Sequence, residues 1–354
     1  MPVPKDGMRD GAPHGAPGHQ RTMLSVGKGN EWLQWGAFNC ASGVEKKVVG
    51  RELAEAGLAP EDIGAFLDGL DGDPVFRAAV QLARRARLAN DLNDALLDIE
   101  SSSFDFTRIA RLADLSAEDF HHHFYALNRP VILTDIVGDW PARTRWSLDF
   151  LRDRFGDFEV TYQKGRSARN HRDSFVDHTV TAPFRVFLDE MADVPEGEGA
   201  PYLIAHDRLL DRPEFRPLLE DVHFDARYLN DADGKGEAFF WIGPAGARTP
   251  MHRDLGNVFM AQITGRKRIK MVPSRQLHLV YNDHGYHSEV DFTDIAFEDY
   301  PLLKNAFIMD FILEPGEFLF IPVGWWHHVE ALDMVITVTG NNFRAPNTLR
   351  PIFE

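Results

Sequence analysis

The sequence has a single cysteine, Cys40, among its 354 residues. One cysteine excludes an intramolecular disulfide and a zinc site built on cysteine pairs, and it is typical of a reducing compartment. The sequence also lacks an apolar run as long as a membrane span, and its first thirty residues lack the apolar core of a signal peptide. These features predict a cytoplasmic protein with no membrane partner.

Positive charge is scarce as well. Lysine and arginine number 38 against 54 aspartate and glutamate residues, which gives a net charge of −16. Nonspecific binding to nucleic acid depends on basic surface, so we predict no nucleic-acid partner. The acidic excess would suit a cationic substrate such as a basic peptide, although solubility is the simpler interpretation.

Composition and periodicity divide the chain into three parts. Residues 1–29 are rich in Gly, Pro and His and predict a flexible tail. Residues 30–102 show apolar side chains at three- and four-residue steps, with Asp73 as a candidate N-cap before Pro74. This pattern predicts a small helical domain, for dimerisation or substrate recognition, ahead of a catalytic domain at 103–354.

The third part predicts a mainly β fold. Its strand candidates are short, are separated by Gly and Pro, and have mostly non-helical links. Such a pattern favours a double-sheet jelly-roll with flanking helices over a parallel α/β sheet. The candidates are FEVTYQ, GAPYLIAH, EAFFWIG, NVFMAQITGRKRIKMV, GEFLFIPV and MVITVTG.

A metal site is predicted by the motif His252-Arg253-Asp254. Side chains two residues apart on a strand point to the same face, so this imidazole and this carboxylate can share one ion. His327, on a distant strand candidate, would complete two histidines and one carboxylate, the set found in non-haem Fe(II) oxygenases. His328 competes with His327, because adjacent residues on a strand point to opposite faces.

Lys267 is the second candidate for a functional residue. Residues 258–272 alternate as one strand, with odd positions apolar or glycine except Lys267, and with polar or basic residues at most even positions. An inward ammonium needs an anionic partner, because burying an unpaired charge is costly. Two interpretations are open: an internal salt bridge to a buried carboxylate, or the carboxylate of a ligand.

Two further groups of histidines are assigned no ligand role. Residues 121–123 are consecutive histidines in a helical stretch, where they fan around the axis and cannot share one ion. His278, His284 and His287 fall in a predicted loop.

Several motifs in one order resemble the jumonji-C (JmjC) and cupin-type hydroxylases, nearest the asparaginyl hydroxylase group, across residues 104–343. They are RPVIL…DWPA, TPMHRD, AQITGRKR and EPGEFLFIPVGWWHHVEAL. The resemblance implies a double-stranded β-helix core and Fe(II) bound by His252, Asp254 and His327, because the family ligand directly follows the paired aromatics. It also implies 2-oxoglutarate as co-substrate and O2 as oxidant.

The resemblance assigns further residues to the co-substrate. Lys267 would meet the far carboxylate of 2-oxoglutarate, assisted by Thr249 and Tyr202. Asn342 resembles a family asparagine near the C1 carboxylate, although Asn341 competes for that position.

One further position departs from the family pattern. An asparagine is common four residues after the metal-binding aspartate, but position 258 is Val and Asn257 lies one step earlier. The family hydrogen bond near the iron is therefore missing or comes from another residue.

The function implied is hydroxylation of an unactivated C–H bond of a protein or peptide side chain, with release of CO2 and succinate. The alternatives are hydroxylation of a free amino acid or small metabolite, N-methyl demethylation, and a non-catalytic metal-binding cupin. The sequence ends before the C-terminal helices that dimerise the asparaginyl hydroxylase, so a homodimer would use another surface, such as the helical block.

Overall fold

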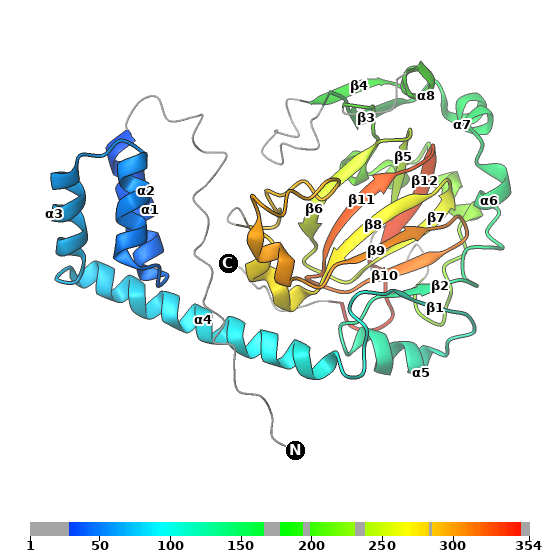
Figure 1. The fold of residues 1–354 in the computed structure, drawn as a ribbon. Coiled ribbons are helices and arrows are strands. Elements are labelled where there is room, and N and C mark those ends of the chain that lie inside the picture. The colour runs from blue at the N-terminus through cyan, green and yellow to red at the C-terminus, as the bar shows by residue number, and fades with distance from the viewer. Residues whose placement is uncertain (1–27, 166–177, 194–198, 231–237, 283–284, 348–354) are drawn as a thin grey trace. The chain divides into compact units, whose positions relative to one another are not determined.

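The computed structural model describes residues 28–165, 178–193, 199–230, 238–282 and 285–347 (Figure 1). The chain divides into two compact units, which are Met1–Asp98 with Phe297–Pro301, and Ile99–Ala296 with Leu302–Glu354. Most of the tail predicted at 1–29 lies outside the described residues. No helix within the described ranges is long and apolar enough to cross a membrane.

The first unit is built from helices, as the apolar period predicts. They are α1 (Lys28–Ala41), α2 (Lys46–Glu55), α3 (Pro60–Leu70) and α4 (Pro74–Glu100). The Asp73 carboxylate accepts hydrogen bonds from the backbone N–H groups of Val75 (2.6 Å) and Phe76 (3.0 Å), so the predicted N-cap of α4 is confirmed. Buried Trp32, Val49, Leu53 and Ile63 form the core between the shorter helices.

The second unit carries the strands. They are β1 (Ala110–Leu112), β2 (Val131–Leu133), β3 (Glu159–Gln163), β4 (Thr179–Pro183), β5 (Ala238–Gly243), β6 (Arg248–Arg253), β7 (Val258–Thr264), β8 (Lys267–Val272), β9 (Met309–Leu313), β10 (Phe318–Ile321), β11 (Trp326–Ala331) and β12 (Val335–Gly340). Six form a sheet in the order β1-β2-β10-β7-β12-β5, and four form a second sheet in the order β6-β11-β8-β9. Apart from β1 with β2, the pairings described are antiparallel. The predicted jelly-roll is confirmed.

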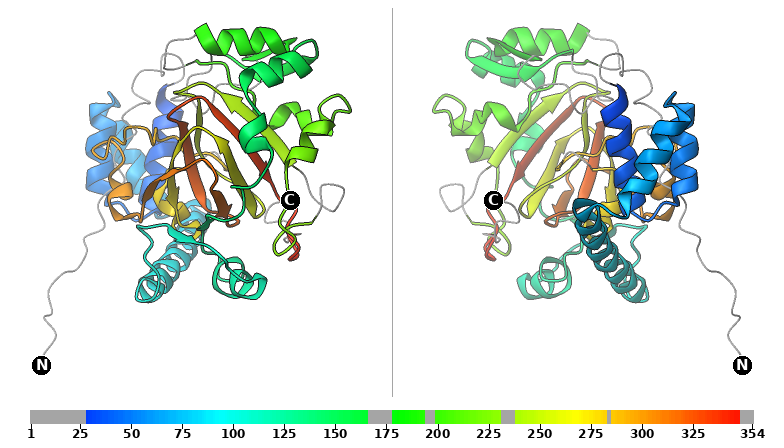
Figure 2. Two further views of the ribbon diagram at one scale, coloured as in Figure 1. Left: turned by 90° about the vertical axis from the view of Figure 1, so that its right-hand side faces the viewer. Right: turned by 90° about the vertical axis from the view of Figure 1, so that its left-hand side faces the viewer.

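Helices cover the outer face of the six-stranded sheet. They are α5 (Ala117–Phe120), α6 (Ala142–Arg145), α7 (Leu148–Phe155) and α8 (Phe184–Asp193). In all three views α7 and α8 lie together beside the β3–β4 pair (Figures 1 and 2). The main core lies on this face, where Phe120, Phe259 and Phe320 belong to one buried cluster. The other face of the sheet is thereby left to line a cavity.

The single strand predicted at 258–272 is wrong. Residues 258–264 form β7 in one sheet and residues 267–272 form β8 in the other, joined at Gly265. Gly265 has a φ of +68°, and a Cβ there would collide with the carbonyl oxygen of Met334, so the change of sheet requires glycine. Because the chain changes sheets, the odd positions before and after Gly265 do not share one face.

Candidate metal centre and its cavity

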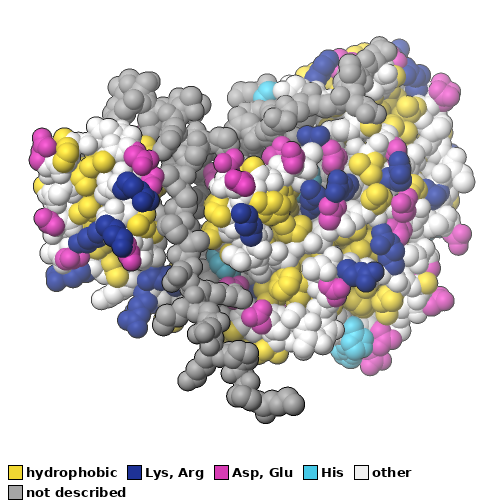
Figure 3. Space-filling model, viewed as in Figure 1, with side chains coloured by type: hydrophobic (Ala, Val, Ile, Leu, Met, Phe, Trp, Pro, Cys, Tyr) yellow, Lys and Arg dark blue, Asp and Glu magenta, His cyan; other side chains and the backbone are white. Residues whose placement is uncertain are grey.

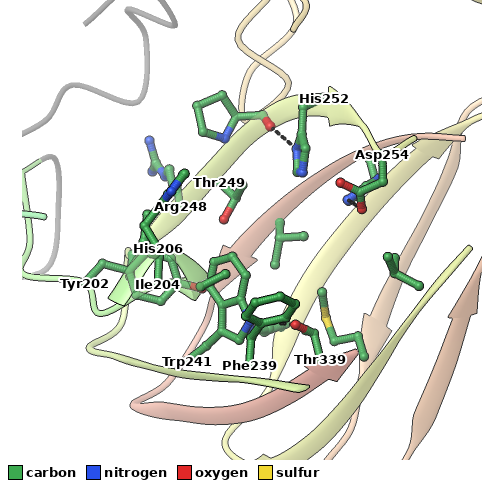
Figure 4. Close-up of a pocket in the computed structure, with 18 of the residues that line it drawn as sticks. Tyr202, Ile204, His206, Phe239, Trp241, Arg248, Thr249, His252, Asp254 and Thr339 are labelled. Carbon is green, nitrogen blue, oxygen red and sulfur yellow. Dashed lines mark hydrogen bonds and ion pairs between the residues drawn. The ribbon is translucent and has the colours of Figure 1, made fainter. Parts of the chain in front are cut away.

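A cavity of about 480 Å³ lies between the two sheets of the second unit. Residues of β5, β7, β10 and β12 line one side, and residues of β6, β8 and β11 line the other. Figure 4 shows Phe239, Trp241 and Thr339 on one side and Thr249 and His252 on the other. The volume is typical of a site for small ligands.

The structure brings His252, Asp254 and His327 together at this cavity. His252 lies on β6, Asp254 directly follows that strand, and His327 lies on β11 as the cross-strand neighbour of His252. One ligand atom from each lies within 4.8 Å of the others, and His327 Nε2 is 3.7 Å from Asp254 Oδ2. Two distant segments therefore supply three donors to one point because β6 and β11 pair.

Backbone contacts orient both imidazoles for metal binding. His252 Nδ1 lies 2.9 Å from the carbonyl oxygen of Pro250, and His327 Nδ1 lies 3.1 Å from that of Trp325. A carbonyl oxygen can only accept, so each Nδ1 donates and each Nε2 presents a lone pair. Burial and the neighbouring His327 lower the pKa of His252 to about 4, which keeps its ring neutral at pH 7. This donor set fits Fe(II).

His328 lies outside this centre. On β11 it is the cross-strand neighbour of Lys270 on β8. Adjacent strand residues point to opposite faces, so the His328 ring lies on the outer face of the four-stranded sheet, opposite to that of His327. Burial lowers its pKa to about 4. Of the two histidines, only His327 lines the cavity.

A β-bulge places Thr249 on the same side as His252. His327 and Val329, two residues apart on β11, pair with His252 and Thr249, which are three apart on β6. In a regular strand, residues three apart point to opposite faces, so the extra residue turns Thr249 inward. Both residues line the cavity, and Thr249 points into it in Figure 4.

Lys267 faces the same cavity from β8. Its side chain is only 1% exposed, and its strand neighbours across the sheet are Ala331 and Leu313. Within the described part of the chain, Lys267 has no hydrogen-bond or ion-pair partner, and burial alone lowers its pKa to about 7. The internal salt bridge left open by the sequence is therefore not formed with any described residue.

Tyr202 reaches the cavity from a segment between strands. Its backbone pairs with Gln163, and its hydroxyl bonds the side chain of Thr249. Burial raises the pKa of the Tyr202 hydroxyl, so it stays protonated and can donate. Gly243 makes room for the ring, because a Cβ there would lie 2.6 Å from Tyr202 Cδ2.

The predicted asparagines do not reach the cavity wall. The Asn342 amide donates to the carbonyl oxygen of Asn230 at 2.6 Å, and Asn342 is not among the residues that line the cavity. Asn257 donates to Asn347 (2.9 Å) and accepts from the N–H of Val323 (2.9 Å), so its amide holds loops together. Val258 lines the cavity instead, which leaves that part of the wall apolar.

Sequence reasoning missed several residues of the cavity wall. Trp241 on β5 donates to Thr339 Oγ1 on β12 at 2.8 Å, and both line the cavity. Tyr286 and His287 line it too, because residues 286–288 run beside β6. The ring of His287 stacks on that of His252, with 5.9 Å between the ring centroids. The alternation of β5 could have indicated Trp241, but pairing of a loop with β6 leaves no local pattern.

The other predicted histidines lie as follows. Residues 121–123 begin a π-helical turn, His121–Tyr125, and all three side chains are exposed. His278 lies in a 3-10 turn away from the cavity wall, and His284 lies outside the described residues.

Comparisons with known proteins agree with this architecture. The family model described as "Cupin-like domain" matches residues 117–348. The chain is 32% identical over 239 residues to "Lysine-specific demethylase JMJ30" of Arabidopsis thaliana, which covers 66% of this chain and 54% of that protein. It is 30% identical over 239 residues to "Lysine-specific demethylase 8" of Xenopus tropicalis (66% and 52%).

A relative with a different name is "tRNA wybutosine-synthesizing protein 5" of Gallus gallus, 30% identical over 241 residues (63% of this chain and 73% of that protein). The chain spans about half the length of the two demethylases. The three names indicate different substrates.

Proposed function

The chain belongs to the cupin-like domain family, among the JmjC oxygenases that use Fe(II), 2-oxoglutarate and O2, and we propose that it hydroxylates an unactivated C–H bond of a protein or peptide side chain. In this proposal His252, Asp254 and His327 hold the iron. When bound, the iron supplies the oxidising chemistry that couples decarboxylation of 2-oxoglutarate, giving succinate and CO2, to hydroxylation of the substrate.

The observation that carries the proposal is the ammonium of Lys267, which has no partner among the described residues and faces the cavity that holds the three metal donors. A buried unpaired charge costs free energy, and a dicarboxylate anchored at its far end would offset that cost. A cupin that only bound a metal would have no use for this lysine. The combination therefore favours catalysis over simple metal binding.

Tyr202 and Thr249 complete the proposed carboxylate site. The two hydroxyls bond each other and line the cavity near Lys267, so they can turn toward a ligand oxygen. The bulge in β6 fixes the position of Thr249 relative to His252. It thereby sets the distance and direction between the group that would hold the far carboxylate of the ligand and the metal site that would hold its other end. This is the arrangement that the likeness to asparaginyl hydroxylases implies.

No acid–base pair is required of the protein in this reaction. Its side chains bind and orient, and the apolar wall that includes Val258, Met260 and Ile321 limits water near the metal donors. Hydroxylation of a free amino acid or small metabolite would use the same groups. Hydroxylation of a peptide side chain and of a small molecule differ only in the substrate that enters the cavity.

Demethylation is the second candidate, because four relatives are named as demethylases. Hydroxylation of an N-methyl carbon gives a hemiaminal that loses formaldehyde, so the same site performs both reactions on different substrates. Formaldehyde release separates the two.

The test is conversion of 2-oxoglutarate to succinate by the purified protein with Fe(II), measured by mass spectrometry. We expect slow uncoupled turnover without substrate, and none in Asp254→Ala. Full turnover in that variant would remove Asp254 from the metal site. A product 16 Da heavier, sought in peptides and metabolites of cells with and without the gene, identifies the substrate.

A further inference from the structure

Asp254 is held in place differently from the two histidines of the metal centre. His252 and His327 lie within strands, and a backbone carbonyl oxygen orients each of their rings. Asp254 directly follows β6 (Figure 4), and apart from His327 Nε2 at 3.7 Å its carboxylate has no polar partner among the described residues. The position of this proposed ligand therefore depends on the loop 254–257 that carries it.

The loop 254–257 packs little of its own surface. Leu255 is 53% exposed, Gly256 has no side chain, and only Asn257 is buried. The loop is neither helix nor strand, and among the described residues its backbone-to-backbone contact with another segment is the bond from the N–H of Gly324 to the carbonyl oxygen of Asp254 (3.2 Å). A segment with so little packing moves readily unless side chains hold it.

Asn347 holds this loop from the C-terminal segment. Its Oδ1 accepts hydrogen bonds from the backbone N–H of Asn257 (3.0 Å) and from Asn257 Nδ2 (2.9 Å). Its Nδ2 donates to the carbonyl oxygen of Asn257 (2.8 Å). One amide therefore binds both backbone polar groups of Asn257 as well as its side chain, which fixes the orientation of the loop as well as its position.

The side-chain oxygen of Asn257 extends the contact to the segment before β11. It accepts from the N–H of Val323 at 2.9 Å, next to Gly324, whose N–H donates to the carbonyl oxygen of Asp254. His327 follows on β11. The two asparagines therefore join the loop that carries Asp254 to the segment that leads to His327, and a polar network whose bonds are made is rigid.

Asn347 is itself fixed and lies outside the cavity. Its Nδ2 also donates to the carbonyl oxygen of Asn341 at 3.1 Å, and the Tyr125 hydroxyl donates to the carbonyl oxygen of Pro346 at 3.2 Å. Asn347 is not among the residues that line the cavity. Its effect on a bound metal would therefore pass through the loop.

We propose that Asn347 is a positioning residue for the metal centre, because its hold on Asn257 keeps the Asp254 carboxylate where one ion can reach it together with His252 and His327. The inference rests on the proposed function, in which these three residues hold Fe(II). Groups that orient a metal ligand change metal affinity by about 10- to 100-fold. Loss of the Asn347 amide weakens metal binding although no ligand is removed.

Titration of the full-length apoprotein with Co(II), whose visible absorption reports its coordination, tests the proposal. Asn347→Ala should raise the Kd for Co(II) about 10- to 100-fold and change the spectrum of the bound ion. Asn257→Ala removes the other side chain of the contact and should act in the same direction. Exposed histidines at residues 121–123, near α5 in Figure 3, offer other sites for the ion, so binding that persists in His252→Ala is subtracted.

Asn230→Ala is the matched control. Asn230 Nδ2 donates to the carbonyl oxygen of Phe343 at 3.0 Å, so this amide also ties a loop to the C-terminal segment, but it makes no contact with the loop 254–257. The control should lower the Tm, as Asn347→Ala does, and leave the Kd for Co(II) unchanged. Circular dichroism at the titration temperature should show both variants folded.

A double-mutant cycle separates positioning of the carboxylate from general loosening of the fold. In the Asp254→Ala background, Asn347→Ala should raise the Kd less than about twofold, because the carboxylate that it positions is already absent. An unchanged Kd in Asn347→Ala, an equal rise in Asn230→Ala, or a fully additive effect with Asp254→Ala would each overturn the positioning role alone. A wild type that binds no more Co(II) than His252→Ala would overturn the metal centre, and with it the proposed function.

Discussion

The two faces of the four-stranded sheet carry the same kinds of side chain, but these side chains make different contacts on each face. His327 and Lys267 lie on the cavity face, and His328 and Lys270 lie on the outer face, each pair drawn from β11 and β8. Both lysines are buried, with exposures of 1% and 9%. The two faces can therefore be compared directly, because each presents one histidine from β11 and one lysine from β8.

The lysines show the difference most clearly. Lys270 Nζ donates to the carbonyl oxygens of Phe292 (2.6 Å) and Thr293 (3.4 Å), whereas Lys267 has no such partner among the described residues. On the outer face Lys270 and Arg268 find partners within the protein, Arg268 with Asp310 at 2.9 and 2.7 Å, whereas the two ring nitrogens of His328 have no hydrogen-bond partner among the described residues. The cavity face is left to be completed by a ligand, which is typical of a binding site.

The largest expected effect comes from the two histidines. His327→Ala should lower bound iron and succinate formation on the order of 100-fold or more, because it removes a proposed metal ligand. His328→Ala should keep most of both, since its ring lies on the outer face. Iron content by mass spectrometry and turnover are measured on the same samples. Equal losses of bound iron and turnover in the two variants would show that the two faces do not differ in metal binding.

The lysines should differ in co-substrate requirement. Lys267→Met should raise the KM for 2-oxoglutarate about 10- to 100-fold, the worth of a charge-assisted hydrogen bond. Lys270→Met should leave that KM unchanged but lower the free energy of unfolding by about 1–3 kcal/mol, because two carbonyl oxygens lose their donor. Without ligand, Lys267→Met should raise the free energy of unfolding, since it removes an unpaired buried charge. Denaturant titration measures the change in the free energy of unfolding for each variant. A change of the same sign in both variants would contradict the expected difference between the two lysines.

Much of the cavity face could be predicted from the sequence. The spacing of His252 and Asp254 indicated a shared metal, and alternation singled out Lys267 as inward. The alternation argument reached the correct residue although the strand it assumed breaks at Gly265, because the β8 part alone places Lys267 inward. Local periodicity identifies a face only within one strand.

What could not be predicted depends on pairing between distant segments. Thr249 was assigned to the co-substrate by the resemblance alone, because strand alternation does not place it in the cavity. It faces the cavity through a bulge opposite His327 and Val329, and a bulge is defined by two strands. His287 lies against His252 because a loop pairs with β6. Asn342 resembles a family residue in sequence but binds the backbone of Asn230 in the fold.

The pH dependence of co-substrate binding should also separate the faces. Burial lowers the pKa of Lys267 to about 7 in the free protein, and a bound carboxylate favours its charged form. Binding above that pH must therefore take up a proton, so the Kd for 2-oxoglutarate should rise about tenfold per pH unit above about 7. Below pH 7 the lysine is already charged and the dependence on it should vanish. Calorimetry in buffers of different ionisation enthalpy measures the proton uptake, which Lys267→Met should abolish.

The smallest expected effect concerns buried hydroxyls. Tyr202 lines the cavity beside Thr249, whereas Tyr162 donates to Glu190 at 2.7 Å and does not line it. Tyr202→Phe should raise the KM for 2-oxoglutarate about 2- to 10-fold, the worth of one neutral hydrogen bond. Tyr162→Phe should leave that KM unchanged and lower only the free energy of unfolding, because the Glu190 carboxylate loses a donor. An unchanged KM in Tyr202→Phe, with kcat also unchanged, would restrict the carboxylate site to Lys267 and Thr249.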